Sequence, residues 1–312
     1  MTNSAAPSLV AVDWGTSHLR VWLLDADGAV LAEHRSDEGM GATARDQFHS
    51  VLEAHLAALE VPESIPVVMC GMVGSRQGWV EASYLPVPVS LSDVAAAAVC
   101  IPGVARDIRI MPGLSKPDRQ SPDVMRSEET QLLGLSRLAP AAGERFICMP
   151  GTHSKWVRMQ GDSVIDFVSF LTGDAFAVLS RHSVLRHSLS GGNVHPASAE
   201  FREAVSASLH SPADILARLF SIRPASLLQD LDPAAAAARM SGYLIGQEIA
   251  GAKARFALPD RVDLIGDPRL GALYDEALAI AGISCTLHDS DTAVIAGLAG
   301  AVSAPPKTGT GG

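Results

Sequence analysis

Residues 9–17 read LVAVDWGTS, an apolar run that stops at an aspartate and a Gly-Thr-Ser turn. A continuous apolar run of this length, bounded by turn residues, is typical of a buried strand. Residues 19–24 predict a second strand, and residues 29–34 predict a third after the turn DADG at residues 25–28. The N-terminal half therefore contains a predicted three-stranded unit whose first strand is followed by a glycine-containing turn.

The turn after the first strand has the composition of a phosphate-binding loop. Glycine lets the backbone approach a ligand closely, so successive N–H groups at Gly15, Thr16 and Ser17 can bind phosphate oxygens. Asp13 ends the strand beside this loop, where a carboxylate suits a hydrated Mg²⁺ ion. The alternative interpretation is an ordinary hairpin turn that happens to contain Gly, Thr and Ser.

The same pattern occurs a second time. Residues 146–149 predict a buried strand, the segment PGTHS follows at residues 150–154, and two further predicted strands complete the unit. This second loop places Gly151, Thr152 and His153 where the first has its Gly-Thr-Ser turn, but it has no aspartate. Two matched loops, one in each half, indicate an internal duplication. We expect them to bind one polyphosphate from the two sides of a cleft.

Predicted helices alternate with further strands along the chain. Residues 48–59 carry an apolar stripe at helical spacing, and residues 128–139 and 291–302 also predict helices. Residues 65–70 and 262–265 predict buried strands. This alternation favours mixed α/β sheets with covering helices. Neither a GxxxxGK[ST] nor a GxGxxG motif follows a predicted strand, which argues against P-loop and Rossmann nucleotide sites.

Composition narrows the class of protein. The 312 residues are 47% apolar and 19% charged, which fits a globular protein of about two domains. A net charge of -10 without a Lys/Arg run disfavours binding to nucleic acid or to an anionic membrane. The sequence shows neither a membrane-length apolar stretch nor a signal peptide, and its four cysteines are scattered. We therefore expect a cytoplasmic enzyme with no nucleic-acid or membrane partner.

Several strings together resemble one known family. Residues 10–17 look like the phosphate-1 motif of the sugar-kinase, Hsp70 and actin superfamily, and residues 149–153 occupy its phosphate-2 position. Over about residues 9–302 the chain resembles the 2-dehydro-3-deoxygalactonokinase family. The strings that carry this narrower likeness are GMVGS (71–75), VMRSEETQL (124–132), MPGTHSKWV (149–157), FLTG (170–173) and DSDTA (289–293).

The resemblance implies an α/β fold with two RNase H-like (actin-like ATPase) lobes of mixed sheet and flanking helices around a central cleft. It places the N-terminal lobe, with the phosphate-1 loop and part of the sugar-acid site, at residues 1–122. The C-terminal lobe, with the phosphate-2 and adenosine regions, would span residues 123–302, and residues 303–312 would form a disordered tail.

The resemblance also implies a reaction: ATP-dependent transfer of the γ-phosphoryl group to the 6-hydroxyl of 2-dehydro-3-deoxy-D-galactonate, in galactonate catabolism. ATP and Mg²⁺ would be the cofactors and the sugar acid the small-molecule partner. The sequence leaves the oligomeric state open, with a homo-oligomer as one possibility. Two alternatives stay open. One is a kinase for another keto-deoxy acid such as 2-dehydro-3-deoxygluconate, and the other is a non-kinase ATP-binding protein of the same superfamily.

The resemblance assigns roles at the phosphates and at the reacting hydroxyl. Asp13 would hold Mg²⁺ through water, and the two loops would contact the ATP phosphates through Gly15, Thr16, Ser17, Gly151, Thr152 and His153. Related sugar kinases place an aspartate at the start of the helix before phosphate-2, whereas this chain has Glu128 and Glu129 there. We favour Glu128 as the proton acceptor, with Glu129 second. Alternatively, both acidic residues only complement the helix macrodipole.

The sugar acid is a carboxylate with hydroxyl groups, so its pocket should offer a cation and polar side chains. The candidates are Ser75, Arg76, Trp79, Arg20 and Lys155, with Tyr84 in addition. Strand alternation leaves open whether Arg20 points toward the cleft. For adenosine, the resemblance indicates the loop after residues 262–265, with Gly266 and Asp267. The superfamily usually has more glycine there, so the adenine contacts are open.

Overall fold

The computed structural model describes residues 6–189 and 194–302. These residues form two compact units. The first contains the described residues of 1–144, 159–166 and 290–312, and the second contains those of 145–158 and 167–289. The predicted tail at 303–312 lies outside the described residues.

The first unit is built on a six-stranded sheet with the order β3-β2-β1-β4-β8-β7. Its first three strands form an antiparallel meander, and β4 and β8 then add in parallel beside β1. The strands are β1 (Pro7–Trp14), β2 (Leu19–Asp25), β3 (Val30–Ser36), β4 (Val67–Cys70), β7 (Val99–Cys100) and β8 (Ile108–Ile110). This is the three-stranded unit that the N-terminal pattern predicted, extended by parallel strands.

Other elements complete the first unit. A small sheet has the order β10-β9-β5, and its strands are β5 (Leu85–Pro86), β9 (Leu114–Lys116) and β10 (Asp123–Met125). The helices are α1 (Phe48–Ala58), the 3-10 turn η1 (Met72–Gly74), α2 (Leu91–Ala96), α3 (Glu128–Leu138) and α9 (Ser290–Val302). Phe48, Leu52 and Leu56 of α1 are buried against the sheet, as their helical spacing predicted.

The second six-stranded sheet has the order β15-β14-β11-β12-β13-β6. Its strands are β6 (Val89–Ser90), β11 (Glu144–Met149), β12 (Ser154–Gln160), β13 (Ser163–Phe170), β14 (Arg261–Gly266) and β15 (Ser284–Asp289). Here β14 lies parallel to β11, and β15 lies parallel to β14. The series β13-β12-β11-β14-β15 repeats the series β3-β2-β1-β4-β8. This repetition matches the internal duplication that the two loops predicted.

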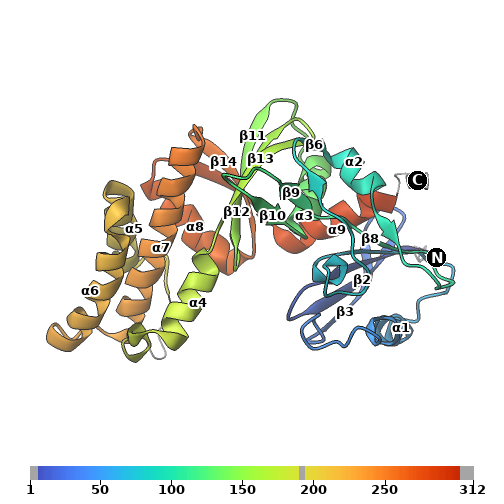
Figure 1. Cartoon of the computed structure of the whole chain (residues 1–312), viewed down its shortest axis with the longest axis horizontal. Helices are drawn as coiled ribbons and strands as arrows, with labels where there is room; N and C mark the ends of the chain where they lie inside the picture. Colours follow the sequence, from blue (N-terminus) through green and yellow to red (C-terminus); the bar gives the residue numbers. More distant parts are fainter. Residues whose placement is uncertain (1–5, 190–193, 303–312) are drawn as a thin grey trace, which may run out of the picture. The chain divides into compact units, whose positions relative to one another are not determined.

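The second unit carries a block of helices between β13 and β14. They are α4 (Thr172–His182), the 3-10 turn η2 (Val184–His187), α5 (Ala199–His210), the 3-10 turn η3 (Pro212–Asp214), α6 (Ile215–Leu228) and α7 (Pro233–Arg255), and α8 (Pro268–Ile280) follows β14. Asp232 caps α7 by accepting from the N–H groups of Ala234 and Ala235 at 2.9 and 3.1 Å. Figure 1 shows α5 and α7 side by side.

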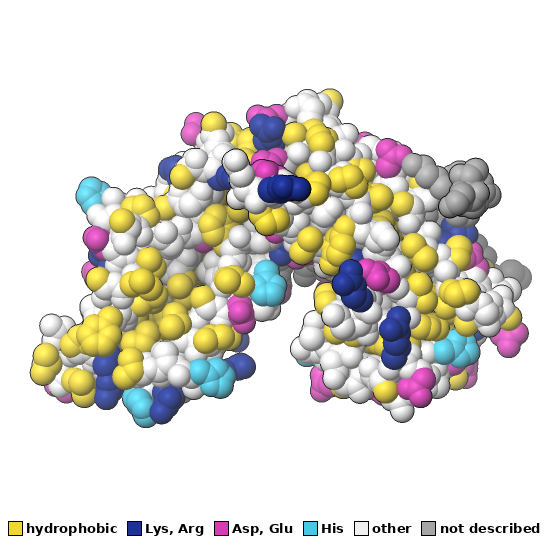
Figure 2. All heavy atoms as spheres, viewed as in Figure 1, with side chains coloured by type: hydrophobic (Ala, Val, Ile, Leu, Met, Phe, Trp, Pro, Cys, Tyr) yellow, Lys and Arg dark blue, Asp and Glu magenta, His cyan; other side chains and the backbone are white. Residues whose placement is uncertain are grey.

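Helix α6 has an outward apolar face. Leu219 and Ile222 are buried toward the helical block, whereas four large apolar side chains on the same helix are exposed. The exposed residues are Leu216, Phe220, Leu227 and Leu228. Figure 2 shows hydrophobic side chains gathered at the surface in this region.

The homo-oligomer that the sequence left open as a possibility stays a prediction. None of the helices in the described part of the chain combines the length and apolarity needed to cross a bilayer.

The division into units differs from the expected boundary at residue 122. Helices α3 and α9 belong to the first unit, although both fall within the expected C-terminal lobe. They pack closely: a Cβ at Gly134 would lie 1.8 Å from the carbonyl oxygen of Ala293, and one at Gly297 would lie 2.0 Å from that of Thr130. The difference arises because this contact joins helices more than 150 residues apart, which no local pattern reveals.

Candidate active site

The predicted phosphate-1 loop connects β1 to β2 in the first unit. The N–H of Gly15 bonds to the carbonyl of His18 at 3.0 Å, and the side chains of Thr16 and Ser17 are exposed. Within the described residues, the N–H groups of Thr16 and Ser17 have no hydrogen-bond partner. The loop therefore presents unused donors, as a phosphate-binding turn requires.

A second glycine-containing segment, residues 39–41, supports this loop. The N–H groups of Met40 and Gly41 donate to the carbonyls of Gly15 and Thr16, each at 2.9 Å. A Cβ at Gly39 would lie 2.4 Å from the carbonyl oxygen of Thr16, so only glycine fits there. The sequence analysis did not single out this segment, although its GMG string (39–41) was a visible signal.

Asp13 lies at the end of β1, between β2 and β4, and only 6% of it is exposed. Arg20, its partner across the β1–β2 ladder, forms an ion pair with its carboxylate. Arg20 also pairs with Asp291 of α9, and Asp291 accepts from Arg35 at 2.9 Å. Burial raises the pKa of Asp13, and the charge of Arg20 partly opposes that rise. Strand alternation thus points Arg20 toward Asp13.

The residues around Asp13 fit a magnesium ion that retains most of its water. Mg²⁺ is commonly held by one or two carboxylates, with water and substrate phosphate completing the octahedron. Asp13 is a single buried carboxylate beside unused loop N–H groups, and no cluster of three or more metal-binding side chains occurs among the residues that the structure describes. This donor set suits water-mediated binding and does not form a complete protein cage.

The turn that precedes the two glutamates of α3 contacts Asp13. The Ser127 hydroxyl is 3.5 Å from Oδ1 of Asp13, and the backbone of Ser127 has φ of 92°. The N–H of Arg126 donates to Glu128 at 2.9 Å, and the N–H of Ser127 donates to Glu129 at 2.8 Å. The left-handed conformation of a non-glycine residue at this turn is costly, and such strain gathers at functional sites.

The two glutamates differ in their surroundings. Glu129 is fully buried, and burial together with the negative charge of Glu128 raises its pKa to about 8. Glu128 is only half-buried. The raised pKa favours the protonated form of Glu129 near neutral pH, and a protonated carboxyl cannot accept a further proton.

The expected sugar-acid residues of the first unit have different environments. Ser75 is buried, and its hydroxyl contacts Sδ of Met40 at 3.4 Å, beside the phosphate-1 loop. The side chain of Arg76 is 82% exposed and lies 3.6 Å from Glu81. Trp79 stacks on Phe48, with ring centroids 6.3 Å apart. Ser75 is thus near the loop, Arg76 is free to reach solvent, and Trp79 packs against α1.

Arg126 is a residue that the sequence analysis missed. It is 9% exposed, donates from Nη2 to the carbonyl of Ala82 at 2.7 Å, and lies over the ring of Tyr84 at 4.4 Å. Its Nε and Nη1 atoms are buried and have no hydrogen-bond partner among the described residues. Its place in the string VMRSEETQL, two residues before Glu128, was the available signal.

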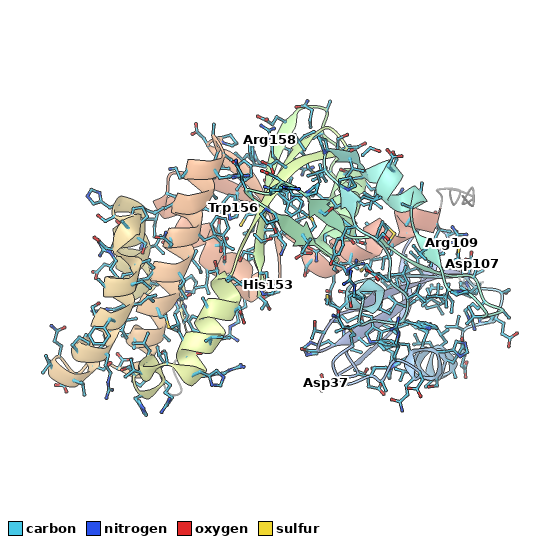
Figure 3. All side chains as sticks on the ribbon, in the orientation of Figure 1. Asp37, Asp107, Arg109, His153, Trp156 and Arg158 are labelled. Carbon is cyan, nitrogen blue, oxygen red and sulfur yellow. The ribbon has the colours of Figure 1, made fainter. Side chains whose placement is uncertain are left out.

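The predicted phosphate-2 loop connects β11 to β12 in the second unit. A Cβ at Gly151 would meet no atom within 4 Å, and the side chains of Thr152 and His153 are exposed. Figure 3 shows His153 beside the start of β12. Lys155 is buried and donates from Nζ to the carbonyl of His153 at 2.9 Å. The Lys155 ammonium group therefore fixes the loop through the His153 carbonyl.

A cavity of about 410 Å³ lies beside this loop, inside the second unit. Gly151 and Asp267 both line it, and Gly266 lies against Pro150, since a Cβ there would be 3.7 Å from the proline ring. The expected adenosine and phosphate-2 regions are therefore adjacent. Asp267 uses Oδ1 to cap α8, accepting from the N–H groups of residues 269 and 270.

Most of the cavity lining is apolar and comes from three helices. The large apolar residues from these helices are Phe176 of α4, Leu244 and Ile245 of α7, and Leu270 and Leu273 of α8, and Val194 adds to them. An apolar pocket with a few polar groups is typical of sites for flat organic ligands such as a nucleobase. Sequence reasoning missed these residues because they lie in three helices separated by long stretches of chain.

A family model described as 2-keto-3-deoxy-galactonokinase matches residues 13–301. The chain belongs to this family. It is 49% identical to the probable 2-dehydro-3-deoxygalactonokinase DgoK1 of Rhizobium meliloti (strain 1021), over 94% of this chain and 96% of that protein. It is 34% identical to the 2-dehydro-3-deoxygalactonokinase of Escherichia coli (strain K12), over 93% and 95%. The family expected from the sequence is confirmed.

Solved structures confirm the fold class. A crystal structure of a 2-dehydro-3-deoxygalactonokinase candidate from Sinorhizobium meliloti is 48% identical, with a TM-score of 0.91, and covers 94% of this chain and 98% of its own. Component A of the (R)-2-hydroxyglutaryl-CoA dehydratase of Acidaminococcus fermentans is 12% identical, with a TM-score of 0.53 over 94% and 97%. Both structures therefore share the α/β fold of this chain.

Proposed function

We propose that this chain catalyses the ATP-dependent phosphorylation of 2-dehydro-3-deoxy-D-galactonate at its 6-hydroxyl, in galactonate catabolism in the cytoplasm. The observation that carries the proposal is the match of the 2-keto-3-deoxy-galactonokinase family model to residues 13–301. The phosphate-1 loop, with its unused N–H donors beside a buried aspartate, adds a site of the expected chemistry.

Phosphoryl transfer depends mainly on alignment of the reactants and on stabilisation of negative charge. In the proposal, the unused N–H groups of Thr16 and Ser17 bind phosphate oxygens, and Gly15 lets the backbone approach them. The N–H groups of Gly151, Thr152 and His153 bind phosphate oxygens in the same way. Asp13 holds the hydrated Mg²⁺ of the ATP complex. When bound, that ion neutralises charge on the phosphates. Arg20 orients the Asp13 carboxylate through their ion pair.

Glu128 is the proposed proton acceptor for the 6-hydroxyl. It is the less buried of the two glutamates, and the N–H of Arg126 orients one of its oxygens. Glu129 remains protonated at neutral pH and fixes the turn by accepting from the N–H of Ser127 and the hydroxyl of Thr130. In this proposal Glu128 takes the proton, and Glu129 fixes the start of α3.

The sugar acid is proposed to contact Ser75 and Arg76, with Trp79, Arg20 and Lys155 as the remaining candidates from the sequence. Arg126 is an additional candidate for the substrate carboxylate. Guanidinium groups are the usual partners of carboxylates, and its Nε and Nη1 atoms have no partner among the described residues. Those nitrogens are buried, so binding requires a shift of residues 74–82, which contact the side chain.

The nucleoside is proposed to occupy the cavity of the second unit. Gly266 permits its close approach, and the apolar lining from α4, α7 and α8 receives the base. Asp267 lines the same cavity at the start of α8, where its Oδ1 atom accepts the two capping hydrogen bonds of the helix. This arrangement places the nucleoside beside the phosphate-2 loop, as a continuous nucleotide site requires.

The test is an assay of ADP release with a panel of keto-deoxy sugar acids. We expect turnover with 2-dehydro-3-deoxy-D-galactonate to exceed that with 2-dehydro-3-deoxygluconate. The product should show a ³¹P signal coupled to the two protons of C6. Comparable or greater turnover with another acid would transfer the proposal to that acid. Slow ATP hydrolysis without dependence on any sugar acid would indicate a non-kinase ATPase.

A further inference from the structure

A buried carboxylate in the second unit lies outside the roles assigned so far. Glu248 of α7 is 1% exposed. It accepts hydrogen bonds from Nε1 of Trp156 at 2.9 Å, from the hydroxyl of Tyr274 at 2.6 Å, and from the hydroxyl of Thr172. Figure 3 shows Trp156 on β12. The three donors thus come from β12, α8 and α4.

A charged carboxylate in this position raises the free energy of the folded state. Its three hydrogen-bond partners are neutral, and burying a charged group without a counter-ion is unfavourable even when it is hydrogen-bonded. Burial raises the pKa of Glu248, and the hydrogen bonds from Thr172, Tyr274 and Trp156 oppose that rise. Replacing the whole network by apolar residues of similar volume would avoid this cost, so the network calls for a role beyond packing.

One chain of contacts leads from Glu248 to the phosphate-2 loop through α4. Thr172 is the first residue of that helix. A Cβ at Gly173 would lie 2.4 Å from the carbonyl oxygen of Gly151, and the N–H of Asp174 donates to the carbonyl of Thr152 at 2.9 Å. By holding Thr172, the carboxylate therefore holds the helix end that packs on the loop.

A second chain of contacts reaches the other end of the same loop. The hydroxyl of Tyr274 that donates to Glu248 also lies 2.9 Å from the hydroxyl of Ser154. Ser154 directly follows the loop, as the first residue of β12. One carboxylate is thereby connected to both flanks of the loop. Thr172 and Tyr274 also line the cavity that contains Gly151.

We propose that Glu248 is a positioning residue that holds the phosphate-2 loop in its nucleotide-binding conformation through Thr172 and through Tyr274 with Ser154. The inference rests on the proposed function, because the role of that loop toward ATP is itself proposed. The proposal predicts that disrupting this network weakens nucleotide binding and leaves the affinity for the sugar acid unchanged.

The experiment compares Glu248→Gln and Thr172→Val with the wild-type protein. We expect Glu248→Gln to raise the KM for ATP about tenfold, because small displacements of a binding loop are costly. Thr172→Val should show part of this effect, and Thr172→Ser, which keeps the hydroxyl, should restore wild-type behaviour. The KM for the sugar acid should stay within about twofold in all three, because no contact of the sugar-acid candidates is removed.

A matched control separates positioning from loss of stability. Ile249→Ala removes buried packing from the neighbouring residue of α7 without breaking a hydrogen bond. It should lower the melting temperature yet leave the KM for ATP unchanged. If Glu248→Gln fails to fold, the Thr172→Val and Thr172→Ser pair decides. An unchanged KM for ATP in Thr172→Val, or an equal rise in Ile249→Ala, would overturn the proposal.

Calorimetric titration with a non-hydrolysable ATP analogue distinguishes this inference from the proposed function. A wild-type protein that binds the analogue but phosphorylates no sugar acid would contradict the proposed function only. A wild-type kinase whose Glu248→Gln and Thr172→Val variants bind the analogue with unchanged affinity would contradict the positioning role only. Weaker binding in both variants, with recovery in Thr172→Ser, supports it.

Discussion

The β1–β2 hairpin of the first unit and the β11–β12 hairpin of the second share a plan but differ in chemistry. Each opens a sheet series with the same order, and each has a Gly-Thr loop between its strands. The first hairpin approaches its loop with Asp13, which is buried and paired with Arg20. At the equivalent place the second has Met149, buried and apolar, followed by Pro150.

The supports of the two loops also differ. Backbone N–H groups from residues 40 and 41 hold the first loop. The first turn of α4 and the ammonium group of Lys155 hold the second. The first unit adds Glu128 and Glu129 near its aspartate, whereas the second adds an apolar cavity. The two hairpins thus share the backbone turn, whereas the acidic groups lie in the first unit and the cavity of about 410 Å³ lies in the second.

The largest expected effect tests whether the acidic group of the first hairpin, and not the equivalent residue of the second, is needed for turnover. Asp13→Asn should lower kcat by about 10³-fold, because it removes the charge proposed to hold Mg²⁺ while keeping the shape of the side chain. Met149→Leu, at the equivalent place in the second hairpin, should leave turnover nearly unchanged. Steady-state ADP release measures both, and circular dichroism checks folding. Equal losses in the two variants would mean that the hairpins are not specialised.

The second expected effect sharpens the roles of the acidic groups in the first unit. Glu128→Gln should lower kcat by about 10²-fold, because general-base catalysis is lost. Glu129→Gln should have a much smaller effect, since glutamine resembles the protonated acid already present at neutral pH. Single-turnover rates measure both. The reverse pattern would assign the base to Glu129, and no effect in either would favour transfer without a protein base.

The third prediction tests whether the first unit also binds the substrate carboxylate. Arg126→Lys keeps the charge but loses the two-pronged geometry of guanidinium, so the KM for the sugar acid should rise about tenfold. The KM for ATP should not change. Arg76→Lys is the comparison variant, because the exposed Arg76 is the other cationic candidate nearby. A rise confined to Arg76→Lys would exclude Arg126 from the carboxylate site.

A smaller effect, on stability, tests the helix pair that places the glutamates. Gly134→Ala should destabilise the protein by about 1–3 kcal/mol, because the new Cβ would overlap the carbonyl of Ala293. Gly143→Ala is the control, since its Cβ would meet no atom within 4 Å. Urea unfolding measures both. If Gly134→Ala and Gly143→Ala are equally stable, α3 and α9 do not pack as closely as described.

The last prediction concerns stability against pH, where the change expected for one pH unit is small. The pKa of Glu129 is raised from 4.5 to about 8, so the folded protein binds more protons than the unfolded chain between these values. Stability should therefore fall as pH rises through this interval, with a slope of at most about 1.4 kcal/mol per pH unit from this group. Glu129→Gln should flatten the dependence. Urea midpoints at several pH values measure the slope, and an unchanged slope would contradict the burial of this carboxyl.

Local sequence patterns were enough to predict the two hairpins, their duplication and the family. Apolar runs and glycine-containing turns act over a few residues, so they are readable in strings such as LVAVDWGTS and MPGTHS. The start of α7 also follows a local rule, because Asp232 caps the helix and a proline occupies its first turn. The order of the strings then indicated the family without any knowledge of contacts.

Tertiary structure alone decided which glutamate is buried, and it placed α3 and α9 together in the first unit. It also brought Phe176, Leu244 and Leu273 to one cavity and connected Glu248 to both flanks of a distant loop. These features depend on contacts between segments far apart in the chain. Burial, pKa shifts and cavity shape are properties of such contacts, whereas strand and turn propensities are properties of neighbouring residues.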